Sequence, residues 1–161
     1  MIIFDLDGTL SNCAHRRPLI DKQARGGLNI PNWRAFYAAC VHDEPIAPVV
    51  DIFRMLHSLG THLEIWSGRS DEVRGETLHW LNKHVFHYSN GWMLADSPEY
   101  VRVRMRPASS TMPDDQLKEQ WLNQAQAEGL TISAVIDDRN KVCAMWRRRG
   151  IVCLQAAAGD F

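Results

Sequence analysis

Short apolar runs alternate with helical patterns along this chain, and this alternation constrains the fold more than any other feature. We expect strands at five short segments, residues 1–4, 62–66, 101–106, 133–136 and 151–154. Apolar residues at helical spacing predict helices over residues 32–41, 48–59, 70–83, 113–128 and 140–149. Strands that alternate with helices are typical of a parallel sheet covered on both faces. The sequence therefore predicts an α/β fold with a doubly wound, mostly parallel, five-stranded sheet.

The length of the chain limits what else it can contain. Its 161 residues suit one domain, so we expect a single domain over residues 1–161. Two segments interrupt the alternation, near residues 13–47 and 84–100, and we expect them to be small insertions that form a cap or flap. No window approaches the roughly 20 apolar residues that cross a bilayer, and the first residues lack the pattern of a secretory signal.

Charge and cysteine content restrict the partners and the compartment. The chain has 18 basic and 19 acidic residues, a net charge of −1, so a polyanion would have to meet a local cluster of positive charge. The four cysteines form no Cys-x-x-Cys pair, which favours free thiols in a reducing cytoplasm. We therefore expect a cytoplasmic protein with no membrane partner. The sequence leaves the oligomeric state open, a homo-oligomer included.

Polar groups follow three of the expected strands at the point where each strand ends. Asp5-Leu6-Asp7-Gly8-Thr9 follows the first, Ser67-Gly68-Arg69 the second, and Asp137-Asp138 the strand at residues 133–136. Lys118 lies in the helix before that last strand. Ligands of such sheets bind at the carboxyl ends of the strands, near the switch point of the strand order. We therefore expect these groups to converge on one pocket.

This set of groups suits phosphate chemistry. Two carboxylates at positions i and i+2 can have different catalytic roles. Asp5 can attack phosphorus as a nucleophile, and Asp7 can protonate the leaving group and then activate water. Further carboxylates at 137 and 138 would let the site hold Mg²⁺, a hard cation that prefers oxygen ligands. Gly8 permits a sharp turn toward the phosphate, and Lys118 can neutralise charge on the phosphoryl group and on Asp5.

Four motifs in this order resemble those of the haloacid dehalogenase-like phosphohydrolase superfamily: Asp5-x-Asp7-Gly8-Thr9, Ser67, Lys118 and Asp137-Asp138. The resemblance implies an aspartyl-phosphate intermediate on Asp5 and a metal site that uses Asp5, Asp7 through its backbone carbonyl, Asp137 and Asp138. It also implies a phosphoryl-binding set, which we expect to comprise Thr9, Ser67, Gly68, Arg69 and Lys118. The aspartate at position 7 is similar to that of phosphatases in the superfamily rather than dehalogenases.

A closer resemblance covers residues 1–12, 64–72 and 106–161. These segments are similar to the phosphatase domain of bacteriophage polynucleotide kinase–phosphatase, an end-healing repair enzyme. The family spacing implies three substrate-binding arginines. Arg16 follows Asp5 by 11 residues, Arg69 lies in the Ser-Gly-Arg string, and Arg106 precedes Lys118 by 12 residues. We expect no kinase domain, because the sequence lacks the Gly-x-x-x-x-Gly-Lys-Ser/Thr loop.

Three functions remain as hypotheses. The first is a Mg²⁺-dependent phosphomonoesterase that acts on nucleic-acid 3′-phosphate ends, in the host cytoplasm if a phage encodes it. The second is a nucleotidase or other small-molecule phosphatase on the same core, which the near-neutral charge favours because polymer binding usually brings a basic stripe. The third is a catalytically inactive binding module, against which the intact acidic residues argue.

Four aromatic residues could stack on a base, although aromatic residues at helical spacing are more typical of a hydrophobic core: Trp33, Phe36, Tyr37 and Trp92.

Overall fold

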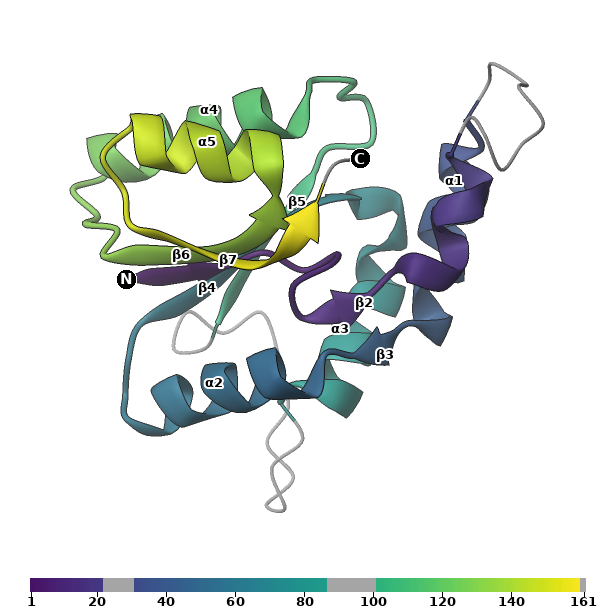
Figure 1. Cartoon of the computed structure of the whole chain (residues 1–161), viewed down its shortest axis with the longest axis horizontal. Helices are drawn as coiled ribbons and strands as arrows, with labels where there is room; N and C mark the ends of the chain where they lie inside the picture. Colours follow the sequence, from purple (N-terminus) through teal and green to yellow (C-terminus); the bar gives the residue numbers. More distant parts are fainter. Residues whose placement is uncertain (22–30, 87–100, 160–161) are drawn as a thin grey trace.

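The computed structural model describes residues 1–21, 31–86 and 101–159, and a five-stranded parallel sheet forms its centre (Figure 1). The strand order is β5-β4-β1-β6-β7. The strands are β1 (Ile2–Phe4), β4 (Leu63–Ser70), β5 (Arg102–Arg106), β6 (Ala134–Arg139) and β7 (Cys153–Gly159). The first strand is central, since Ile3 pairs with Glu64 on one side and with Val135 on the other. The predicted fold class is therefore confirmed.

Helices cover both faces of the sheet (Figure 1). On one face lie α4 (Asp114–Ala127) and α5 (Asn140–Arg148), and on the other α2 (Ala47–Ser58) and α3 (Arg74–His84). Successive side chains of a strand point to opposite faces, so Ile3 packs with the tryptophans of α4 and α5, whereas Phe4 packs with α2 and α3. This alternation gives the domain two apolar cores, one on each side of β1.

The first predicted insertion, near residues 13–47, is built largely of short helices. It contains the 3₁₀ helix η1 (Ala14–Leu19), then α1 (Trp33–Ala38) and the 3₁₀ helix η2 (Ala39–His42). A small antiparallel sheet of β2 (Ser11–Asn12) and β3 (Glu44–Pro45) closes the insertion at its base. Its two ends are thereby tied together beside the carboxyl end of β1. Residues 87–100, most of the second expected insertion and the position of Trp92, lie outside the described residues.

Three strands differ from their expected bounds by more than one residue. β4 continues through Ser67-Gly68-Arg69 to Ser70, and β6 continues through Asp137-Asp138 to Arg139. Both extensions are irregular, because the pairing register shifts between Ser67 and Ser70 and again between Asp137 and Arg139. β7 begins at Cys153 rather than 151 and reaches Gly159. Apolar patterning does not detect these extensions, because their residues are polar or small.

Two arginines of β5 form ion pairs with glutamates. Arg102 lies 3.8 Å from the carboxylate of Glu128, and Arg104 lies 3.4 Å from that of Glu64. Arg106, the last residue of the strand, points instead toward the carboxyl edge of the sheet.

Within the described ranges, no helix is long and apolar enough to span a membrane.

Candidate active site

Asp5 lies at the end of β1, beside a lysine from α4 and an aspartate from β6. Lys118 Nζ donates hydrogen bonds to Asp5 Oδ1 at 2.5 Å and to Asp137 Oδ2 at 2.8 Å, and all three side chains are buried. Burial raises the pKa of Asp5, and the carboxylates of Asp137 and Asp138 raise it further, whereas Lys118 opposes the shift. Burial alone would lower the pKa of Lys118, but Asp137 and Asp5 raise it above its usual range. The lysine therefore stays charged and holds the carboxylates together.

Three carboxylates gather at this point. One oxygen each from Asp5, Asp137 and Asp138 lies within 4.8 Å of the other two, and all three residues are buried. Lys118 supplies a single ammonium, so the group keeps excess negative charge, and burial followed by repulsion from Asp137 raises the pKa of Asp138. An all-oxygen set with surplus negative charge fits a hard divalent cation such as Mg²⁺.

A glycine makes room for one of these carboxylates. Gly8 has φ +92°, and a Cβ at this position would collide with the Asp138 carboxylate. Side chains other than glycine are disfavoured at this φ, so both the backbone and the close approach require glycine. The predicted turn at Gly8 therefore brings the loop after β1 against the end of β6.

Asp7 faces a different set of partners from the insertion and from β4. Arg16 Nη2 donates to Asp7 Oδ1 at 2.6 Å, Ser11 Oγ donates to the same oxygen at 3.0 Å, and Arg69 donates to both carboxylate oxygens. Burial by itself would raise the pKa of Asp7, but Arg69 and then Arg16 lower it well below its usual range. Asp7 is therefore an ionised carboxylate that occupies the donors of two arginines.

Sequence reasoning missed the residue that positions these arginines. Asp43 is buried and accepts from Arg16 Nε at 2.8 Å, from Arg16 Nη2 at 2.7 Å and from Arg69 Nη2 at 3.0 Å. The indole nitrogen of Trp80 in α3 donates to the Asp43 backbone carbonyl at 2.6 Å. Asp43 lies between η2 and β3 in an insertion with no motif, so its sequence neighbourhood carried no signal.

A second aspartate organises the other side of the site. Asp114, the first residue of α4, forms ion pairs with Arg106 and Arg139. Arg106 Nε also donates to the Gly68 carbonyl at 2.8 Å, which ties β5 to β4. Neither Asp114 nor Arg139 was a predicted site residue. The available signals were the place of Asp114 one turn before Lys118 and the place of Arg139 directly after the two aspartates of β6.

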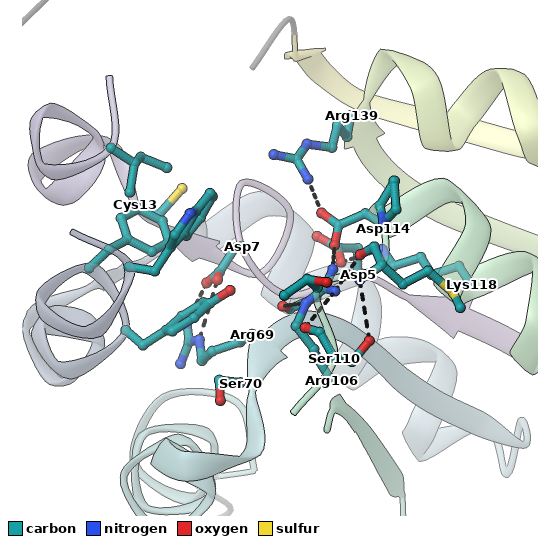
Figure 2. Close-up of a pocket in the computed structure, with 18 of the residues that line it drawn as sticks. Asp5, Asp7, Cys13, Arg69, Ser70, Arg106, Ser110, Asp114, Lys118 and Arg139 are labelled. Carbon is teal, nitrogen blue, oxygen red and sulfur yellow. Dashed lines mark hydrogen bonds and ion pairs between the residues drawn. The ribbon is translucent and has the colours of Figure 1, made fainter. Parts of the chain in front are cut away.

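A cavity of about 570 Å³ joins these groups. Figure 2 shows Asp7 and Arg69 on one side of it, and Asp114, Arg139 and Lys118 around Asp5 on the other. Its lining includes most of the predicted site residues: Asp5, Asp7, Gly68, Arg69, Arg106, Lys118, Asp137 and Asp138.

The other three predicted residues lie behind the lining. Arg16 reaches the site through Asp7. Ser67 is buried, and its Oγ accepts from the Arg69 backbone N–H at 3.1 Å. Thr9 Oγ1 is buried with no hydrogen-bond partner among the described residues. The structure thus brings all predicted residues to one end of the sheet but gives these three no exposed place in the cavity.

The whole chain matches a family model. The model describes the polynucleotide kinase PNKP phosphatase domain, and the match covers residues 1–161. The chain belongs to this family. The reaction class of the PNKP phosphatase domain is phosphoric monoester hydrolysis, which agrees with the phosphate chemistry expected of the aspartates at the ends of β1 and β6.

Solved structures agree with the PNKP phosphatase assignment. Chains in two structures of a Pnkp1/Rnl/Hen1 complex, one described as an RNA repair complex, are 26% and 25% identical to this chain, with TM-scores of 0.71 and 0.73. The alignments cover 99% of this chain but 43% and 46% of those chains, so it spans less than half of their length. A haloacid dehalogenase-like hydrolase from Streptococcus pneumoniae is 17% identical, with a TM-score of 0.58 over 96% of this chain and 82% of that one, and shares the fold.

Proposed function

We propose that this domain is a Mg²⁺-dependent polynucleotide 3′-phosphatase that acts through an aspartyl-phosphate intermediate. The observation that carries the proposal is the placement of Asp5 between Lys118 on one side and the Asp7–Arg69 pair on the other, in one cavity. Nucleophile, cation and acid–base group are thereby within reach of a single phosphate.

In the first step, the Asp5 carboxylate attacks phosphorus and the bond to the leaving oxygen breaks. Lys118, held by Asp5 and Asp137, offsets the charge that gathers on the phosphoryl oxygens. A divalent cation at Asp5, Asp137 and Asp138 would supply further charge neutralisation and would fix the orientation of the phosphoryl group. The backbone carbonyl of Asp7 is a further oxygen available to this cation in our proposal.

Asp7 then serves both halves of the reaction. The arginines keep Asp7 ionised in this structure. An ionised Asp7 can act as the general base that activates water to hydrolyse the aspartyl phosphate. To act as the acid for the leaving oxygen, Asp7 must gain a proton. An anionic substrate that takes over the donors of Arg69, which lines the cavity, would weaken the hold of this arginine on Asp7 and favour that protonation.

The polymer end is the substrate that the surroundings of the cavity favour. Arg69, Arg106 and Arg139 line it, and their guanidinium groups, paired with Asp7 and Asp114 in this structure, are donors for which the phosphates of a nucleic-acid end can compete. The similar Pnkp1 chains belong to a complex described as an RNA repair complex, which supports a nucleic-acid substrate for this domain.

A substrate panel with Mg²⁺ tests the proposal. It compares a 3′-phosphorylated oligonucleotide, the same oligonucleotide with a 5′-phosphate, and free 3′- and 5′-mononucleotides. We expect the highest kcat/KM for the 3′-phosphorylated oligonucleotide, and loss of phosphate release in EDTA with recovery on added Mg²⁺. Equal or faster turnover of 5′-mononucleotides would replace the proposal with the nucleotidase hypothesis. An absence of turnover for every substrate would favour the inactive binding module.

A further inference from the structure

The short helix α1 places three aromatic rings beside the catalytic groups. Trp33 and Tyr37 are stacked, with ring centroids 5.8 Å apart and an interplanar angle of 27°. Trp33 and Phe36 meet edge to face at 5.7 Å. Aromatic residues at this spacing are usually core residues, so the separate environment of each ring decides whether one is available to a ligand.

Phe36 has a structural task. It is buried, and the guanidinium carbon of Arg16 lies 4.2 Å from the centre of its ring. The same guanidinium donates to Asp7 and, at 3.3 Å, to the Phe36 backbone carbonyl. Phe36 therefore supports the arginine that holds Asp7, and α1 is connected to the catalytic groups through this contact.

Trp33 is different, because it is exposed as well as part of the cavity lining. It is 43% exposed, and it lines the same cavity as Asp5, Asp7 and Lys118. Tyr37 and Arg34, also from α1, line the cavity with it. The cavity thus has a charged region that suits a phosphate and an aromatic wall that a phosphate alone would not use. Large aromatic side chains exposed in a concave site are characteristic of ligand contacts.

We infer that Trp33 is the stacking platform for the base of the nucleotide that carries the scissile phosphate. This inference rests on the proposed function and adds the recognition of the nucleobase to it. Stacking on an indole tolerates every base, because each base has a π-face, so the contact selects a nucleotide without selecting a sequence. The volume of about 570 Å³ lies in the range of cavities that hold a small organic ligand rather than a bare phosphate.

The test compares substrates with and without a terminal base. Trp33→Ala and Trp33→Phe are assayed on a 3′-phosphorylated oligonucleotide and on one whose terminal 3′-phosphorylated sugar is abasic. Removal of one base–aromatic stack by alanine substitution weakens binding by roughly 5- to 150-fold. We therefore expect Trp33→Ala to lower kcat/KM by about tenfold or more on the base-bearing substrate. We expect less than about a twofold change on the abasic one, and Trp33→Phe to retain most of the activity. Met55→Ala, at a residue 60% exposed on α2, is the matched control.

A binding readout separates this inference from the proposed function. In the Asp5→Asn background, an oligonucleotide with 2-aminopurine as its 3′-phosphorylated terminal base should lose fluorescence on binding, and Trp33→Ala should abolish that quenching. Equal losses on base-bearing and abasic substrates, or unchanged quenching in Trp33→Ala, would overturn the stacking role while leaving 3′-phosphatase activity in place. A wild-type domain that releases no phosphate from 3′ ends would instead overturn the proposed function, and the quenching experiment would still report on Trp33.

Discussion

Lys118 Nζ lies 2.5 Å from Asp5 Oδ1, although the two residues are 113 positions apart in sequence. The contact joins α4 to the end of β1 and places the ammonium where negative charge would develop on a phosphoryl group. Because the same nitrogen also contacts Asp137, Lys118 links Asp5, the proposed nucleophile, to the acidic end of β6. The first prediction concerns this residue.

Lys118→Met should lower kcat by about 10²–10³-fold at saturating Mg²⁺, which is the usual loss when one donor to a developing oxyanion is removed. Lys141→Met, at an exposed residue of α5, is the matched control and should leave kcat unchanged. Phosphate release measures both variants. If Lys118→Met reduces activity only as far as its folded fraction falls, the lysine has a structural role alone.

Asp7→Asn should slow the overall reaction by about 10²–10⁴-fold, because proton transfer to the leaving group and from water would both lose their carrier. The variant should still accept phosphate on Asp5 when the leaving group is a good one, so acid-quenched protein should retain covalent phosphate. Labelled phosphate in the precipitated protein measures this. Asp51→Asn, at an exposed carboxylate of α2, should show neither effect. Covalent phosphate on an Asp5→Asn protein would contradict the assignment of Asp5.

Asp43→Asn should destabilise the fold and loosen substrate binding, since it removes the buried negative charge that faces Arg16 and Arg69. Loss of one partner in a buried ion pair typically costs about 3–5 kcal/mol. Urea unfolding should show a decrease of this size in the free energy of unfolding, and KM should rise. The control is Glu44→Gln, the exposed neighbour in β3. An unchanged KM would mean that Asp43 stabilises the insertion without positioning the arginines.

Metal binding should strengthen as pH rises. The pKa values of Asp5 and Asp138 are raised, so in the metal-free protein these groups bind more protons folded than unfolded. The stability of the metal-free protein should therefore fall as pH rises above the unfolded pKa of an aspartate, about 4, toward the folded values. Because Mg²⁺ competes with those protons, its stabilising effect should grow over the same range. Thermal unfolding with Mg²⁺ and with EDTA, at about pH 5 and about pH 8, tests this, and an equal Mg²⁺ shift at both pH values would contradict it.

Gly8→Ala should destabilise the protein by more than about 2 kcal/mol, because it combines left-handed backbone strain with a collision against Asp138. Gly75→Ala is the matched control, since a Cβ there meets nothing within 4 Å and Gly75 lies in α3. Because Gly75 lies in the first turn of α3 rather than in its interior, the substitution should leave stability unchanged or raise it by less than about 1 kcal/mol. Urea unfolding of both variants measures the contrast. A loss at Gly8 no larger than the change at Gly75 would show that the loop after β1 can relax.

Patterns along the chain were sufficient to predict the sheet and most of the site. The aspartates at positions 5, 137 and 138 follow apolar strands, and parallel strands bring their carboxyl ends to one edge, so sequence position alone predicts that these residues meet. Lys118 could be assigned to the same site because its helix directly precedes β6, whose carboxyl end carries two of these aspartates. The bounds of β4 and β7 could not be predicted, since their last residues are polar or small and pair through shifted registers.

Sequence by itself determined the α/β fold and the acidic and basic residues gathered at the end of β1, because strand periodicity and strand-end motifs are local properties. Only the tertiary structure decided which partner each charge has. It pairs Arg16 and Arg69 with Asp43, joins Arg106 and Arg139 through Asp114, and leaves Trp33 exposed while it buries Phe36. The physical reason is that a buried charge needs a counter-charge in space, and Asp43 of the insertion and Asp114 of α4 reach these arginines only when the chain is folded.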